Sequence, residues 1–193
     1  IPILILIYIT IAFTFRSFSQ PILLFCLMPV SLIGVAWGHW IHGFPVNILS
    51  LLGVIALIGI MVNDGLVLIG KFNNNLKQNF NFNEGLIDAG KSRFRAIFLT
   101  TATTVAGLTP LLLEKSRQAQ WLKPMAISVS YGIAFATILT LILLPIFISL
   151  NNDLKVIFKW LVSGNYPDKE FVERAIIEKK EEQKMNQMNN PEN

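Results

Sequence analysis

The sequence predicts an all-α integral membrane protein, and three observations lead to that fold class. Hydrophobic residues make up 53% of the 193 residues, whereas charged residues make up only 15%. The charges are also segregated, because Arg16 and Asp64 are the only ones before Lys71, and none occurs in residues 96–113 or 124–152. Uncharged runs of this length suit a bilayer, in which a spanning helix needs about 20 apolar residues. The runs lack the alternation of barrel strands, so we expect helices.

Five membrane spans are predicted from these runs. They lie at about residues 1–15, 21–40, 48–70, 96–113 and 124–150. Together they form a predicted membrane domain over residues 1–150, and residues 151–193 form a charged cytoplasmic tail. The first span is too short to cross a bilayer by itself, and the chain opens with Ile1 where an intact product opens with Met. We therefore expect the chain to be the C-terminal part of a longer protein.

The segment that leads into the fourth span has a pattern of its own. Residues 73–83 contain six asparagines and predict a polar, turn-rich stretch. Apolar residues then recur at helical spacing beside Lys91, Arg93 and Arg95. This combination is typical of an amphipathic helix that lies in the membrane interface.

Lysine and arginine predict the orientation of the spans. Eight of these residues lie on one side of the predicted membrane and three on the other, and the richer side is expected to be cytoplasmic. The chain would then start outside and end in the cytoplasm. The eight are Arg16, Lys71, Lys77, Lys91, Arg93, Arg95, Lys155 and Lys159, and the three are Lys115, Arg117 and Lys123.

Asp64 is the most informative residue, because it is a carboxylate in the middle of the apolar third span. Such a group costs about 2.5–3.5 kcal/mol on insertion scales, so it is retained with a polar partner, a wet path or protonation. At 100° per residue, one side of this helix is small and polar, which suits contact with other helices. The opposite side, which includes Val62 and Ile69, is predicted to face lipid. The small side consists of Gly53, Ala56, Gly59, Asn63, Asp64 and Gly70.

Small residues and hydroxyls also form stripes in the next two spans. In the fourth span, Thr100, Thr103, Thr104 and Gly107 share one face. In the fifth, Ser128, Gly132, Ala136 and Thr140 recur at every fourth position, which favours plain helix packing. For Asp64 we favour a functional role, because packing alone has no use for an ionisable group.

The sequence contains no pattern that predicts an enzyme. No nucleophile, base and orienting group converge, and no spacing of metal ligands occurs, so we expect no catalytic residues, no bound metal and no cofactor. Nothing in it predicts nucleic-acid binding. His39 and His42 stand beside Trp37 and Trp40, and we interpret them as solvated residues of the membrane rim.

Three parts of the sequence carry a resemblance to a known family: the stretch GIMVNDGLVLIGKFNNN, Arg93, and the segment from Thr100 to Pro110. In these residues the chain resembles the C-terminal transmembrane half of a resistance-nodulation-division (RND) transporter. The match is to the hydrophobe/amphiphile efflux, or acriflavine-resistance, branch. FRSFSQPILLFCLMPVSLIG and FPVNILSLLGVIALIG agree with the same family in order and spacing. The resemblance covers about residues 1–150 and implies that the five spans are the last five of twelve.

The resemblance also implies a proton relay. RND pumps are proton antiporters in which two aspartates of the N-terminal half and one lysine of the C-terminal half form a buried cluster. Asn63 stands at the lysine position, with Asp64 beside it, and Thr100 and Arg93 match a relay hydroxyl and a basic residue near it. The missing lysine is a departure from the family pattern. The residues expected to pack helices together are Gly53, Ala56, Gly59, Thr104 and Gly107.

The resemblance implies part of a proton-driven transporter that exports small amphiphilic compounds across a bacterial inner membrane. The expected partners are the missing N-terminal half, two further copies in a homotrimer, a periplasmic adaptor and an outer-membrane channel. The start of the chain would be periplasmic. Two alternatives stay open: an accessory protein-export subunit of the Sec type, and a passive module that only anchors or assembles. The Sec relative has a charged Arg-Glu sequence after its Asn-Asp pair, and this chain has GKFNNN there.

Overall fold

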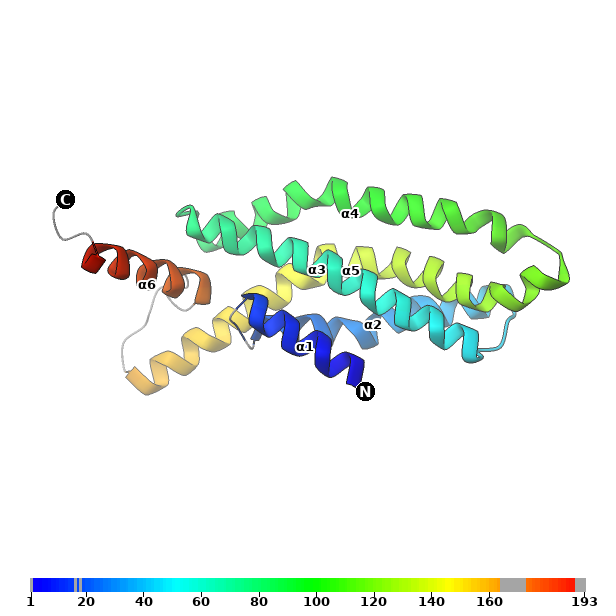
Figure 1. Cartoon of the computed structure of the whole chain (residues 1–193), viewed down its shortest axis with the longest axis horizontal. Coiled ribbons are helices and arrows are strands. Elements are labelled where there is room, and N and C mark those ends of the chain that lie inside the picture. The colour runs from blue at the N-terminus through cyan, green and yellow to red at the C-terminus, as the bar shows by residue number, and fades with distance from the viewer. Residues whose placement is uncertain (1, 16, 18, 164–172, 190–193) are drawn as a thin grey trace.

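The computed structural model describes residues 2–15, 17, 19–163 and 173–189. In these residues all regular elements are helices (Figure 1). They are α1 (Pro2–Phe15), α2 (Ser19–His42), α3 (Ile48–Lys77), α4 (Phe82–Leu113), α5 (Arg117–Ser163) and α6 (Arg174–Asn189). The all-α prediction is therefore confirmed for the described residues.

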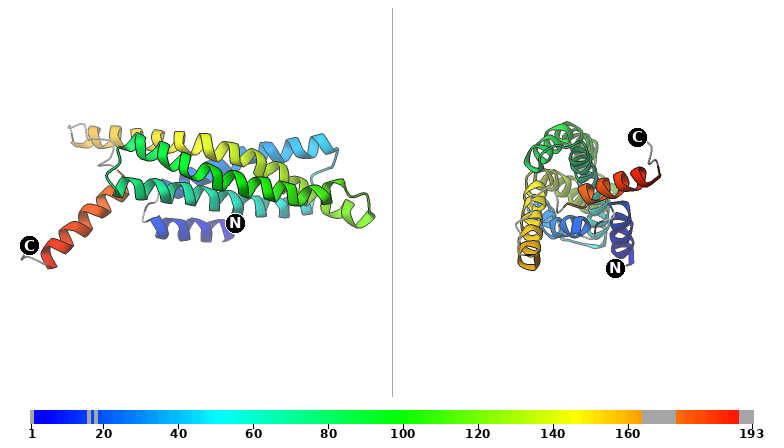
Figure 2. Two further views of the ribbon diagram at one scale, coloured as in Figure 1. Left: turned by 90° about the horizontal axis from the view of Figure 1, so that it is seen from above. Right: turned by 90° about the vertical axis from the view of Figure 1, so that its left-hand side faces the viewer.

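Four of the described helices, α2 to α5, are long and apolar enough to cross a membrane. They run side by side along the long axis of the molecule (Figures 1 and 2). The predicted first span corresponds to α1, whose 14 residues are too few for a crossing without tilt or thinning of the bilayer. Arg16, residues 164–172 of the predicted tail and residues 190–193 lie outside the described residues.

The helices extend beyond the apolar runs that predicted them. The predicted interfacial helix and the fourth span are one continuous helix, α4, and α5 continues to Ser163. A helical backbone ends where its hydrogen bonds end, which is not necessarily where hydrophobicity ends. The asparagine-rich stretch does contain the predicted turn, since Asn79 has a φ of 68°. Asn75 closes this turn by donating to the Gly85 carbonyl at 2.9 Å and to Asp88 at 2.8 Å.

Helices α2, α3 and α5 form what we call the three-helix frame, and glycines allow its close approaches. A Cβ on Gly34 would lie 2.5 Å from Cβ of Phe135, and one on Gly53 would lie 2.7 Å from the Met125 carbonyl oxygen. A Cβ on Gly132 would overlap Leu57. Ser128, Gly132, Ala136 and Thr140 of the predicted α5 stripe are all buried, so the interpretation of that stripe as helix packing is confirmed.

Helix α4 is attached much more loosely than the frame. In its most apolar stretch, 11% of the residues are buried, against 44% in α2 and in α3. Beyond Arg95 its buried residues are Ile97 and Thr101. The Thr101 hydroxyl forms a hydrogen bond with the Thr137 hydroxyl of α5. One narrow stripe therefore holds the membrane part of α4 to the rest of the described chain.

Candidate functional site

The start of α3 is fixed by a hydrogen-bonded corner. Asn47 caps the helix, because its side chain accepts from the Ser50 backbone N–H at 3.0 Å and its own N–H donates to the Ser50 hydroxyl at 3.2 Å. Nε2 of His39, in α2, lies 2.7 Å from the same hydroxyl. His39 is only 4% exposed, so its interpretation as a solvated rim residue is wrong. This corner sets where α3 enters the bundle and how it is rotated.

Asp64 lies in the second half of α3 and is 6% exposed. The next residue, Gly65, is where three helices meet: a Cβ there would overlap Leu24 of α2 and lie 3.6 Å from Cδ2 of Leu144 of α5. A larger residue here would require the end of the Leu24 side chain to shift. Leu24 therefore packs directly against α3 one residue away from the carboxylate.

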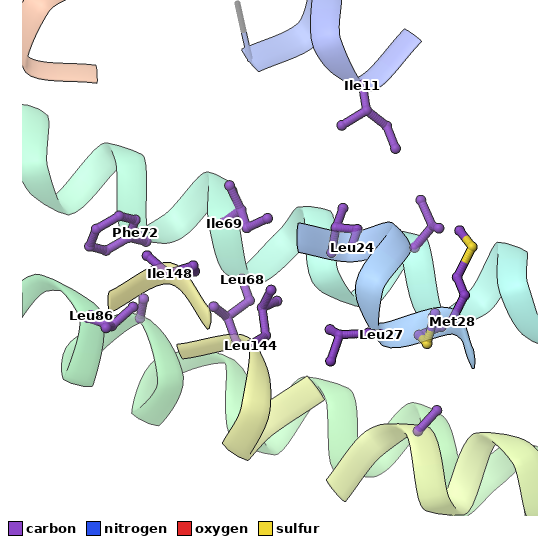
Figure 3. Close-up of a cluster of buried hydrophobic side chains, with 14 of the residues drawn as sticks. Ile11, Leu24, Leu27, Met28, Leu68, Ile69, Phe72, Leu86, Leu144 and Ile148 are labelled. Atoms are coloured by element: carbon purple, nitrogen blue, oxygen red, sulfur yellow. The ribbon is translucent and has the colours of Figure 1, made fainter. Parts of the chain in front are cut away.

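An apolar layer separates Asp64 from the Lys77 end of α3. Leu68, Ile69 and Phe72 of α3 pack with Leu144 and Ile148 of α5, as Figure 3 shows. Each of these five side chains is at most 4% exposed. These side chains put an apolar layer between Asp64 and the polar end of the helix at Lys77.

Asp64 stands at the edge of the buried side of α3. At 100° per residue, the buried positions of this helix span an arc of about 180°, centred near Gly65 and Phe72, with Asp64 close to one border. Asn63 and Gly59 lie on the other, exposed side. The carboxylate is thus held by the frame and adjoins a side of α3 that the described chain leaves uncovered.

This rotation corrects the predicted faces of α3. Val62 and Ile69, which were expected to face lipid, are 6% and 0% exposed inside the bundle. The reason is that this side of α3 packs against both α5 and α2, where Leu144 and Leu24 lie beside Gly65. Of the predicted small side, Gly53 and Asp64 are buried within the described chain.

The predicted relay residues are not brought together by the described chain. Thr100 is exposed and donates to the Ala96 carbonyl of its own helix at 2.7 Å. Arg93 is half-buried, and its Nε is buried without a hydrogen-bond partner among the described residues. In this part of the chain no hydrogen bond or ion pair joins Asp64 to either residue.

The predicted packing residues divide into two groups. Gly53 packs against α5, and Ala56 is half-buried. Thr104 is half-buried and donates to the Thr100 carbonyl at 2.8 Å. A Cβ on Gly59 or on Gly107 would meet no atom of the described chain within 4 Å. These last two glycines therefore border open space here.

Two contacts that hold the site were not predicted from the sequence. One is Gly65 against Leu24, which no spacing rule indicates, because it depends on where α2 crosses. The other is the Thr101–Thr137 hydrogen bond, because the predicted contact face of α4 was that of Thr100 and Thr104 and not that of Thr101. The stripe of Ile97, Thr101 and Val105, at every fourth position, carried a signal for the second contact.

Known proteins resemble the membrane part of the chain. The model of the AcrB/AcrD/AcrF family matches residues 2–151. Swarming motility protein SwrC of Bacillus subtilis is 29% identical over 142 residues, which are 73% of this chain and 14% of SwrC. Cobalt-zinc-cadmium resistance protein CzcA of Cupriavidus metallidurans is 27% identical over 143 residues, 74% of this chain and 14% of CzcA.

A solved structure agrees with these relatives. A heavy metal efflux pump, in its crystal form II, superposes with a TM-score of 0.69 at 27% identity, over 76% of this chain and 15% of that one. The chain thus spans about one seventh of the length of the relatives it matches. The family match extends over nearly all of α1 to α4 and most of α5. The chain belongs to the AcrB/AcrD/AcrF family, within the RND transporters that the sequence resembled.

Proposed function

We propose that the chain is the C-terminal membrane part of a proton-driven efflux transporter and that Asp64 carries the coupled proton. The observation that supports this most is the placement of Asp64, a 6%-exposed carboxyl group in an apolar spanning helix, at the border of a buried and an open side. A charge at that depth is costly without a partner, and protonation removes the cost. The two protonation states therefore favour different helix surroundings, which is what a coupled transporter needs.

The rest of the transporter, in this proposal, covers the open sides of α3 and α4. The open glycines Gly59 and Gly107 permit close helix contact, and the buried, unpaired Nε of Arg93 is available to a polar partner. Asn63 and Thr100 are exposed on the same two helices. A partner that approaches there would come within reach of Asp64 at the edge of its buried arc.

The energy source in this proposal is the proton gradient across a bacterial inner membrane, with no cofactor and no covalent chemistry. A proton that moves through 100 mV makes about 2.3 kcal/mol available. We place the described spans among the last five of twelve, the start of the chain in the periplasm and its end in the cytoplasm. The complete protein would act as a trimer with a periplasmic adaptor and an outer-membrane channel.

Two substrate classes are candidates. Small amphiphilic compounds are the first, because the sequence resembles the branch that exports them. Divalent metal cations are the second, because CzcA is a cobalt-zinc-cadmium resistance protein and the matching structure is a heavy metal efflux pump. Efflux assays with an amphiphilic dye and with cobalt, zinc and cadmium separate the two.

Asp64→Asn in the complete gene product tests the proposed function. The change keeps size and hydrogen-bonding capacity but removes ionisation, so we expect normal insertion and efflux at the level of an empty vector. Thr100→Ala is expected to cause a weaker loss, since water can replace a hydroxyl in a wet relay. Asp153→Asn, the same chemical change in the polar end of α5, is the matched control and is expected to retain efflux. Full efflux from Asp64→Asn at matched expression would contradict the proposal.

A further inference from the structure

The residues after the family match form a helix that packs back onto the bundle. The match ends at residue 151, whereas α5 continues to Ser163 and α6 follows. Figure 2 shows α6 leaving the bundle at the end where α3 stops. Ala175, in the first turn of α6, is 5% exposed and belongs to the apolar core, and Ile176 packs against that core. The start of α6 is therefore docked, although the rest of the helix points away.

Polar contacts fasten α6 to the end of α3. Nζ of Lys77 lies 2.9 Å from Oε2 of Glu178. Nζ of Lys179 donates to the Lys77 carbonyl at 2.6 Å and to Oδ1 of Asn79 at 2.7 Å. The last carbonyls of a helix have no partner within it and carry partial negative charge, so a cation there is favourable. Lys179 thus caps α3 from another helix.

A second contact ties the start of α6 to α5. Nζ of Lys155, in α5, lies 3.3 Å from Oε1 of Glu173, the residue before α6. Glu173 is 3% exposed, so this carboxylate is held inside the protein by its pairing with Lys155. One short segment therefore contacts both the end of α3 and α5 at Lys155, and these two helices meet beside Asp64.

We propose that α6, with Glu173 before it, is a latch that holds the end of α3 to α5 at Lys155 and slows the movement of the helix that carries Asp64. An isolated 16-residue helix of mixed charge is marginal in water, so α6 is helical chiefly while docked. Since the docked arrangement is the observed one, opening the latch adds to the barrier for any rearrangement of α3 against α5. The effect on transport rests on the proposed function, whereas docking itself does not.

Hydrogen exchange of the amides in residues 174–189, in the complete gene product in lipid nanodiscs, tests the docking. We expect protection in the wild type, and exchange on the order of two- to fivefold faster in Glu178→Lys, because an ion pair near the protein surface stabilises by up to about that factor. The charge swap Lys77→Glu with Glu178→Lys is expected to restore protection. Glu181→Lys, the same charge change at an exposed position of α6, is the matched control and is expected to leave protection unchanged.

Two results would overturn the docking part of the proposal. One is an unprotected α6 in the wild type, and the other is protection that Glu178→Lys leaves at the wild-type level. Protection that falls in Glu178→Lys but does not return in the charge swap would assign the loss to something other than the Lys77–Glu178 pair, which also contradicts the latch.

The initial rate of efflux tests the effect on transport. We expect Glu178→Lys to transport roughly two- to fivefold faster at matched expression, and the charge swap to return to the wild-type rate. An unchanged or slower rate, with protection lost, would show that α6 does not restrain transport. A wild type that transports neither substrate class would contradict the proposed function, while hydrogen exchange would still decide whether α6 docks.

Discussion

The three-helix frame and helix α4 are all apolar enough to cross a membrane, but they differ in how the chain holds them. Glycines of the frame, such as Gly34 and Gly53, lie against backbone or Cβ atoms of α5. In α4, a Cβ on Gly90 or Gly107 would meet nothing within 4 Å. The frame is therefore packed by this chain alone, whereas α4 and the exposed side of α3 are the surfaces on which the rest of a larger assembly would pack. Asp64 stands at the border between the two regions.

The largest expected effect comes from filling a glycine of the frame. Gly53→Leu places a side chain against the Met125 carbonyl, which cannot move without moving α5, so we expect a loss of about 1–3 kcal/mol in the free energy of unfolding. The measurement is thermal unfolding of the 193-residue chain in detergent, followed by tryptophan fluorescence. Gly59→Leu, six residues along the same helix, is the control, with an expected change within about 0.5 kcal/mol. If both variants lost the same free energy of unfolding, Gly53 would not be more closely packed than Gly59, and the assignment of a buried and an open side of α3 would be wrong.

A smaller effect is expected where α4 is attached to the frame. Thr101→Val removes the hydroxyl that bonds to Thr137, and hydrogen bonds between membrane helices contribute about 0.6 kcal/mol on average. Thr100→Val is the matched control, because its exposed hydroxyl bonds to its own helix. We expect faster amide exchange in α4 for Thr101→Val alone. An equal response in the control would mean that the Thr101 contact does not anchor α4.

The smallest effect concerns the turn that joins α4 to α5. Two hydrogen bonds lower the pKa of Glu114, the residue that directly follows α4. The donors are the backbone N–H groups of Ser116, at 3.0 Å, and of Lys115, at 2.8 Å. A carboxyl with a lowered pKa stabilises the fold above its ordinary pKa, about 4.3, and this stabilisation is lost as the pH falls through the lower, folded value.

Amide protection at Ser116 in the wild type is therefore expected to exceed that of Glu114→Gln near pH 6 and to approach it near pH 3. If the difference in protection between the wild type and Glu114→Gln were the same at both pH values, the carboxylate would be excluded as its cause.

The sequence was sufficient to predict the helices and the location of the unusual carboxylate, because both depend on local hydrophobicity. It was not sufficient to predict which side of α3 is buried. Small residues at Ala56, Gly59 and Asn63 indicated one side as the contact side, but α5 and α2 pack on the other, where Leu144 and Leu24 lie beside Gly65. Leu24 is forty-one positions earlier in the chain, and no periodicity within α3 contains that information.

Two features near the ends of the helices show the same limit. The buried His39 depends on Ser50 in the next helix, so its aromatic neighbours alone suggested a solvated residue. The tail was expected only to be charged and cytoplasmic, yet Lys179 and Glu178 pair with the end of α3. In both cases the residue's partner lies in another helix, so the local sequence does not contain the information.

The most direct test of the account is whether the carboxyl group of Asp64 changes its protonation during transport. Infrared difference spectra of the complete protein in membranes, recorded as an imposed proton gradient is switched on, report protonated carboxyl groups through their C=O stretch. We expect a carboxyl band whose intensity changes with the gradient. This band should be absent in Asp64→Asn and present in Asp153→Asn. A spectrum that Asp64→Asn leaves unchanged, in protein that transports normally, would show that this carboxylate is only a packing residue.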